Sequence, residues 1–219
     1  GAAERIHQGF IGKPVSGQFY YYCGRLNTQS RPGPETARLR NWVFDIALSG
    51  DIIVEQNIHV LDVANWYLQG HPVKAAGTGG RKARADVGDC WDHFVVTYTY
   101  PDEVLVDFSS GQFTYGYDDL CMRLYGSEGT VDSHYGGEVS IRGKNNSWDG
   151  GKTNTIYESG AVANIEKFCD SIRNNTPIDN TLESAHSTMT SILGRMAAYQ
   201  RREVTWKELL RRREAWTFP

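Results

Sequence analysis

The stretch HFVVTYTYPDEVLVDFSSGQF, residues 93–113, decides the fold class. Apolar and aromatic side chains occupy every second position from Phe94 to Tyr100, which is the period of a strand with one buried face. Pro101 and Asp102 favour a tight turn, so residues 103–113 are predicted to return as the partner strand. The sequence therefore predicts an antiparallel pair in the middle of the chain.

The segments on either side of this pair separate into further strands and helices. Patterns of period two predict strands at 15–26, 73–77, 120–125, 130–134 and 138–142. Patterns of period 3.6 predict helices at 4–11, 35–48, 55–70, 162–172, 182–196 and 205–213, with a Gly/Asn-rich loop at 143–160. We therefore expect an α+β fold, with a large, mostly antiparallel open sheet and helices packed on one face.

Two finer expectations concern apolar side chains. The helix at 162–172 is expected to bury its apolar residues, and Trp42 and Trp66 are expected in the core rather than as platforms for sugar rings. The strands carry large aromatic residues on both faces, so the helix-free face of the sheet is expected to meet a partner subunit.

Length, charge and cysteine usage exclude several classes of protein. A chain of 219 residues with 40% hydrophobic content can bury the core of one domain, which we assign to residues 1–219. The net charge of −3 and the scattered basic residues argue against nucleic acid, and no apolar run of about 20 residues suggests a membrane span. Four cysteines lack metal or redox spacing, and the choice between cytoplasm and periplasm stays open.

The segment EQNIHVLD, residues 55–62, carries the most chemistry. On a continuous helix Glu55, His59 and Asp62 stand at i, i+4 and i+7 and share one face. Spacing alone allows an ordinary helix start, a general acid/base histidine beside a carboxylate, or a metal site completed by His71 or His93. The residues themselves leave these three interpretations open.

Longer motifs resemble those of a known family. They are Arg40-Asn41-Trp42, residues 49–66 (SGDIIVEQNIHVLDVANW), 70–73 (GHPV), 79–84 (GGRKAR), 92–94 (DHF) and 204–210 (VTWKELL). In this order they resemble the C-terminal domain of Gfo/Idh/MocA oxidoreductases, from about residue 9 to the end. The resemblance implies a glyceraldehyde-3-phosphate-dehydrogenase-like C-terminal domain that binds a carbohydrate or cyclic polyol and forms homo-oligomers through its open sheet.

The resemblance also implies a preceding Rossmann domain that binds NAD or NADP. This chain has no Gly-x-Gly-x-x-Gly segment, and Gly77-Thr78-Gly79-Gly80 is not followed by a helix pattern. The family's Glu-Lys-Pro motif is missing too. We therefore expect the chain alone to bind no dinucleotide, to hold no metal and to catalyse no hydride transfer.

Site roles follow from the resemblance, residue by residue. His59 falls on the family's catalytic histidine, Glu55 on the preceding acid, where many members have aspartate, and Asp62 on the acid that follows. Candidates for the cleft rim or for substrate contacts are Arg40, Arg81, Arg84 and His93. Two alternatives remain: a cofactor-free binding or assembly module, and a metal-assisted sugar lyase or hydrolase that uses the same acids and histidine.

Overall fold

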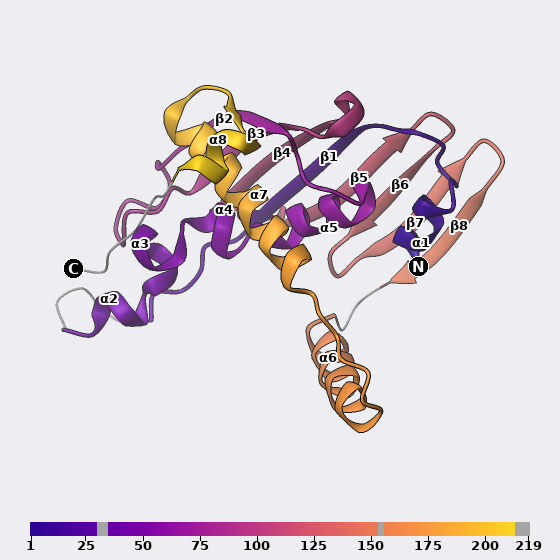
Figure 1. Cartoon of the computed structure of the whole chain (residues 1–219). Helices are drawn as coiled ribbons and strands as arrows, with labels where there is room; N and C mark the ends of the chain where they lie inside the picture. The colour runs from indigo at the N-terminus through magenta and orange to yellow at the C-terminus, as the bar shows by residue number, and fades with distance from the viewer. Residues whose placement is uncertain (30–34, 153–155, 213–219) are drawn as a thin grey trace.

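The computed structural model describes residues 1–29, 35–152 and 156–212. Within them one open sheet of nine strands forms, in the order β8-β7-β6-β5-β1-β4-β3-β2-β9 (Figure 1). The strands are β1 Pro14–Cys23, β2 Lys74–Gly80, β3 His93–Thr99, β4 Leu105–Gln112, β5 Asp119–Gly126, β6 Gly129–His134, β7 Glu138–Gly143, β8 Ser147–Lys152 and β9 Val204–Thr205. Every neighbouring pair is antiparallel except β1 with β4, so the predicted sheet class is confirmed.

The central pair follows the alternation in the sequence. In β3 and β4 the residues Phe94, Val96, Tyr98, Val106 and Phe108 are fully buried. Each lies two positions from the next along its strand, so these side chains share one buried face, which the polar Ser110 and Gln112 continue at the end of β4. A short 3-10 turn, η2 (Pro101–Glu103), joins the strands where the turn was predicted.

Helices cover this buried face of the sheet (Figure 1). The helices are α1 Ala2–His7, α2 Ala37–Arg40, α3 Ile46–Ser49, α4 Ile52–Glu55, α5 Ile58–Leu68, α6 Ile156–Arg173, α7 Thr181–Gln200 and α8 Trp206–Arg211, with a 3-10 turn η1 at Trp42–Phe44. Helix α5 packs on β1 and β5, and α7 packs on β2 and β3. No helix among the described residues combines the length and apolar character needed to cross a membrane.

The predicted helix at 35–48 is wrong, because the segment breaks into α2, η1 and α3. The carbonyl of Phe44 accepts backbone hydrogen bonds from Asp89 (2.9 Å) and Cys90 (3.2 Å) rather than from the next helical turn. Asp45 is extended, and its carboxylate caps α3 by accepting from the backbone of Ala47 at 3.0 Å. A tertiary contact therefore overrides the helical period.

The predicted loop at 143–160 also conceals an element, because β8 pairs with β7 there. Trp148 anchors this strand to α1. The guanidinium carbon of Arg5 lies 4.3 Å from the centroid of its half-buried ring, as in a cation–π contact. Glycines and asparagines around it weaken the strand pattern in the sequence.

The burial predicted for α6 is wrong as well. Figure 1 shows α6 projecting away from the sheet, and its apolar residues Val162, Ile165, Phe168 and Ile172 are exposed. Trp42 (45% exposed) and Trp66 (59% exposed) lie at the surface, so their assignment to the core is wrong too. These side chains have the spacing of a buried face, but nothing in the described residues covers them.

Close packing of α7 on the sheet gives a direct test. A Cβ on Gly194 would lie 1.9 Å from the hydroxyl oxygen of buried Tyr98, whereas one on Gly160 of α6 meets nothing within 4 Å. We expect Gly194→Ala to lower the free energy of unfolding by about 1–3 kcal/mol, since α7 or Tyr98 must move. Gly160→Ala should raise it by about 0.5–1 kcal/mol through helix propensity. Urea denaturation of both variants measures this, and equal shifts would contradict the packing argument.

Candidate functional site

The site begins at Asp51, a buried residue at the start of α4. Its φ of 80° lies in a region that L-residues rarely adopt. The conformation is fixed by the carboxylate, which accepts hydrogen bonds from the backbone of Ile52 (2.7 Å), the backbone of Trp91 (3.2 Å) and the Tyr199 hydroxyl (2.5 Å). Burial raises the pKa of Asp51, and these three donors oppose that rise. Asp51 thereby joins α4 to the 81–92 loop and to α7.

The helix predicted at 55–70 forms as α5 from Ile58, but its predicted start is wrong, because Glu55 belongs to α4 and the two helices divide at Gln56 and Asn57. The backbone N–H of Asn57 donates to the carbonyl of Ile52, five residues back, at 2.8 Å. One such wide turn rotates α5 relative to α4, so Glu55 does not keep the regular helical offset from His59 and Asp62. Breaks of this kind occur often at functional sites.

Glu55, the last residue of α4, is half-buried, and the pKa of its carboxyl lies near neutral pH. Burial raises the pKa of its carboxyl to about 7, and the charge of Arg84 partly opposes this rise. Oε2 of Glu55 is buried, and within the described part of the chain it has no hydrogen-bond partner. A buried acceptor without a partner is costly, so this oxygen is available to a ligand or to a donor from elsewhere.

His59 and Asp62 lie one turn apart on the exposed side of α5. The imidazole of His59 stacks with Tyr135, with ring centroids 6.0 Å apart and planes inclined by 27°. Asp62 accepts a hydrogen bond from the Ser187 hydroxyl of α7 at 2.6 Å. The ring of Tyr135 thus positions His59, and Ser187 of the neighbouring helix α7 positions Asp62.

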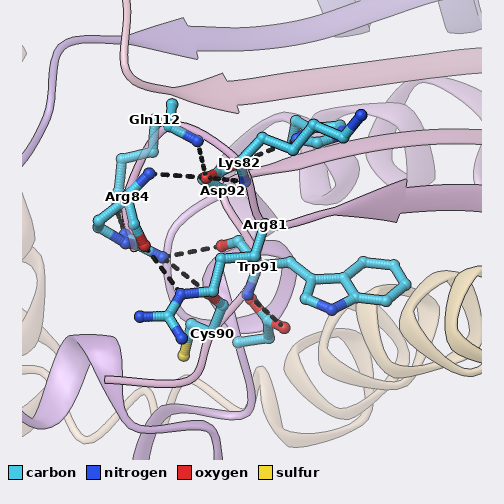
Figure 2. Close-up of polar contacts among 10 residues, drawn as sticks. Arg81, Lys82, Arg84, Cys90, Trp91, Asp92 and Gln112 are labelled. Carbon is cyan, nitrogen blue, oxygen red and sulfur yellow. Dashed lines mark hydrogen bonds and ion pairs between the residues drawn. The ribbon is translucent and has the colours of Figure 1, made fainter. Parts of the chain in front are cut away.

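Arg84 lies behind these residues and is fully buried. Its guanidinium donates to the carbonyl of Trp91 at 2.8 Å, to the carbonyl of Cys90 at 3.3 Å and to the side-chain oxygen of Gln112. Gln112 in turn donates to the side-chain oxygen of Gln56 at 2.9 Å. Burial lowers the pKa of Arg84. Figure 2 shows Arg84 and Gln112 beside the 81–92 loop, and the bond from Gln112 to Gln56 continues this chain of contacts to the break between α4 and α5.

Asp92 organises the loop that carries Arg84 (Figure 2). Its Oδ2 accepts backbone hydrogen bonds from Lys82, Ala83 and Arg84 at 2.7–2.9 Å, and its Oδ1 accepts one from His93 Nδ1 at 2.6 Å. Burial raises the pKa of Asp92, but these donors outweigh it and the pKa is lowered overall. Arg81 binds the same loop through the carbonyls of Arg84 (2.8 Å) and Val87 (3.2 Å).

A groove of about 740 Å³ lies between α5 and α7 and includes Asp62. Exposed Trp66 lines it together with Asn65, Glu183 and His186. An exposed indole among amide, carboxylate and imidazole groups has the character of a surface that contacts a polyhydroxylated ligand.

The structure therefore separates the residues predicted for the site. Glu55, His59 and Asp62 lie along α4 and α5, whereas Arg81 and Arg84 hold the 81–92 loop and the exposed Arg40 lies on α2. His93 starts β3, with its ring edge-on to Phe113 at 6.4 Å. Sequence reasoning missed Tyr135, Gln56 and Gln112, because a turn residue and two glutamines form no motif.

The comparisons with known proteins agree with this arrangement. A model of the GFO/IDH/MocA C-terminal domain matches residues 1–132, more than half of the chain. The chain belongs to the GFO/IDH/MocA family. A comparison with proteins of curated function found no match.

Solved structures of GFO/IDH/MocA type share the fold. A levoglucosan dehydrogenase in complex with NADH and L-sorbose is 13% identical with a TM-score of 0.74, over 95% of this chain and 63% of its own. An oxidoreductase structure from Thermotoga maritima is 18% identical with a TM-score of 0.70, over 93% and 58%. A myo-inositol dehydrogenase structure from Sinorhizobium meliloti 1021 is 16% identical with a TM-score of 0.66, over 93% and 60%. This chain thus spans 58–63% of the length of these structures.

The glycines at 77–80 do not fit a dinucleotide. They end strand β2, where a Cβ on Gly77 or Gly79 would lie 2.6 Å or 2.3 Å from a carbonyl oxygen of β3. A phosphate-binding loop needs free N–H groups at the start of a helix, and these backbones pair with a strand instead.

The pKa of Glu55 predicts a pH-dependent stability. Because the folded-state pKa of about 7 lies above the usual 4.5, the protonated form favours folding. Stability from this group is complete below pH 4.5 and is lost as the pH rises to about 7. We expect Glu55→Gln to match wild type at pH 4 and to exceed its free energy of unfolding by about 1–3 kcal/mol at pH 8. Urea denaturation across this range measures it.

Exposed Glu158 on α6 offers the matched control, since Glu158→Gln should leave the pH dependence unchanged. Parallel curves for wild type and Glu55→Gln would contradict the burial of this carboxyl.

Proposed function

We propose that this chain is the substrate-binding and acid/base domain of an NAD(P)-dependent oxidoreductase acting on a sugar, glycoside or cyclic polyol. The observation that carries the proposal is Glu55, a half-buried carboxyl with a pKa of about 7, beside the helix that presents His59. The sugar and polyol dehydrogenases among the structural neighbours support the substrate class.

The proposed chemistry of this chain is proton transfer. A ring nitrogen of exposed His59 accepts the proton of the substrate hydroxyl as the adjacent carbon is oxidised. Glu55, ionised above pH 7, stabilises the resulting imidazolium, and Asp62 adds a second negative charge one turn further along α5. The nicotinamide, held by the remainder of the longer protein, supplies the redox chemistry.

The remaining predicted residues take two roles in this proposal. Arg84 and Arg81 are positioning residues: Arg84 acts through Gln112 and Gln56, and Arg81 through the carbonyls of its loop. Arg40 is exposed and His93 is partly exposed, and both remain proposed substrate contacts. The groove beside Asp62 and Trp66 is the proposed surface for the more distant hydroxyl groups of the substrate.

The same proposal covers the partners of the chain. The exposed apolar residues of α6 would pack against the remainder of a longer protein, since the solved relatives are longer than this chain. The helix-free face of the sheet is the proposed surface for homo-oligomers. The alternative of a metal-assisted lyase at Glu55, His59 and Asp62 has less support. Among the described residues, the side chains spaced to bind a metal ion are Cys121, Asp132 and His134, which lie elsewhere.

The role of His59 is tested in the full-length protein with NAD⁺ and a panel of polyols that includes levoglucosan and myo-inositol. We expect His59→Ala to lower kcat by about 10²–10⁴-fold, since the hydroxyl proton then lacks its acceptor. Exposed Tyr117 lies in the loop between β4 and β5, and Tyr117→Ala should keep wild-type turnover. Full activity of a folded His59→Ala protein would exclude the assigned role.

The pH profile of kcat/KM tests Glu55 separately. Because the carboxylate is the active form, we expect kcat/KM to fall as the pH decreases through about 7. Glu55→Asp should keep the acidic limb at reduced rate, whereas Glu55→Gln should change its midpoint, because only the requirement for a neutral His59 imidazole then remains. A limb with an unchanged midpoint in the glutamine variant would assign the titration to a group other than Glu55.

A further inference from the structure

A cluster of metal-ligating side chains lies on the helix-free face of the sheet. In β5 the buried Met122 and Leu124 face the helices, so Cys121 and Arg123 point to the opposite face. Strand β6 pairs His134 with Cys121 and Asp132 with Arg123. Adjacent strands thereby bring a thiol, an imidazole and a carboxylate to one place.

Two separations between the three ligand atoms are close to those around a small divalent ion, and the third is bounded by 4.8 Å. Cys121 Sγ lies 3.7 Å from Asp132 Oδ1, and His134 Nε2 lies 3.4 Å from the same oxygen. The three ligand atoms all lie within 4.8 Å of one another. For comparison, a tetrahedral zinc ion with ordinary bond lengths spaces sulfur, nitrogen and oxygen ligands about 3.4–3.6 Å apart.

We propose that Cys121 Sγ, Asp132 Oδ1 and His134 Nε2 bind a divalent metal ion of the zinc class, with water in the fourth position. Mixed thiolate, imidazole and carboxylate ligands favour zinc over magnesium or calcium, which take oxygen ligands. The site lies apart from Glu55 and His59, on the opposite face of the sheet.

Neighbouring side chains prepare these ligands. Asp119 Oδ1 lies 2.8 Å from His134 Nδ1, so the carboxylate accepts that N–H and leaves the Nε2 lone pair for the ion. This is the carboxylate–histidine arrangement that surrounds many zinc sites. Tyr20 is paired with Cys121 across β1 and β5, so its side chain lies next to the thiol on the same face of the sheet. Asp119 thus orients His134, and Tyr20 flanks the thiol of Cys121.

Charge and proton balance are consistent with binding. Burial raises the pKa of the Cys121 thiol to about 11, so the ion must displace its proton to solvent as the S–metal bond forms. The thiolate, Asp132 and Asp119 then carry three negative charges against two on the ion and one on Arg123. Arg123 donates to Asp132 Oδ1 at 2.9 Å, and this oxygen has a second lone pair for the metal.

In the single chain an ion can reach the site from solvent. Cys121 itself is fully buried, but the side chains of Asp132 (38% exposed) and His134 (30% exposed) open to the surface. The thiolate would therefore lie at the bottom of the site, with the two other ligands at its rim.

Metal titration of the purified, metal-free protein tests this site without any assay of turnover. Isothermal titration with Zn²⁺ should give one ion per chain, with a Kd in the micromolar range or below. Co²⁺ should give a thiolate-to-metal charge-transfer band in the near ultraviolet, which reports a sulfur ligand directly.

Variants assign the signal to the proposed residues. Cys121→Ser should abolish the cobalt band and weaken zinc binding by at least about 100-fold. Asp132→Asn should weaken it too, and Asp119→Asn should cost about 10–100-fold through the orientation of His134. Cys169→Ser on α6 is the matched control and should keep both signals.

Absence of a stoichiometric zinc isotherm, or a cobalt band that survives in a folded Cys121→Ser protein, would overturn the site. If Cys121→Ser does not fold, unchanged zinc affinity in Asp132→Asn and Asp119→Asn would overturn it equally. Loss of turnover in His59→Ala bears only on the proposed oxidoreductase role.

Discussion

The geometry of the candidate active site depends on the burial of one cation, Arg84. Removing a guanidinium from water is costly, and the chain compensates with two backbone carbonyls and the oxygen of Gln112. The ring of Phe44, 4.8 Å from the guanidinium carbon, covers another side. Because Gln112 also donates to Gln56, the same set of bonds fixes the break between α4 and α5. The positions of Glu55 and His59 follow from that break.

The two buried acids near Arg84, Asp92 and Asp51, stabilise different parts of the structure. Asp92 is held ionised by three successive backbone N–H groups and His93, so it shapes the loop around the guanidinium. Asp51 holds α4 against the end of the same loop through Trp91. Glu55 differs from both: part of its carboxyl faces no donor in the described residues, and its pKa rises to about 7. Structural acids here are fully hydrogen bonded, whereas the proposed catalytic acid is not.

Sequence patterns predicted what depends on local chemistry. The alternation from Phe94 to Tyr100 fixed β3 and its buried face, because burial on one side of a strand demands period two. The break at Gln56 could not be predicted, since the side chain that bonds to Gln56 there belongs to Gln112, 56 residues away. The exposure of Phe168 on α6 could not be predicted either. An apolar stripe indicates that a helix face is covered, but it does not indicate which segment covers it. The cluster at Cys121 could not be predicted from the sequence for a third reason. Its ligands come from two strands and form no spacing motif.

Strand alternation allows one sheet to support both proposed sites. In β5, Met122 faces the helices that carry Glu55 and His59, and its neighbour Cys121 faces the opposite side with His134. A bound ion would cross-link β5 to β6 on the open face, beneath the core that supports α5. Tyr135, which stacks on His59, directly follows His134 in the chain. An ion that restrains His134 would therefore also restrain the backbone that carries the ring beside His59, which couples the two faces through one peptide bond.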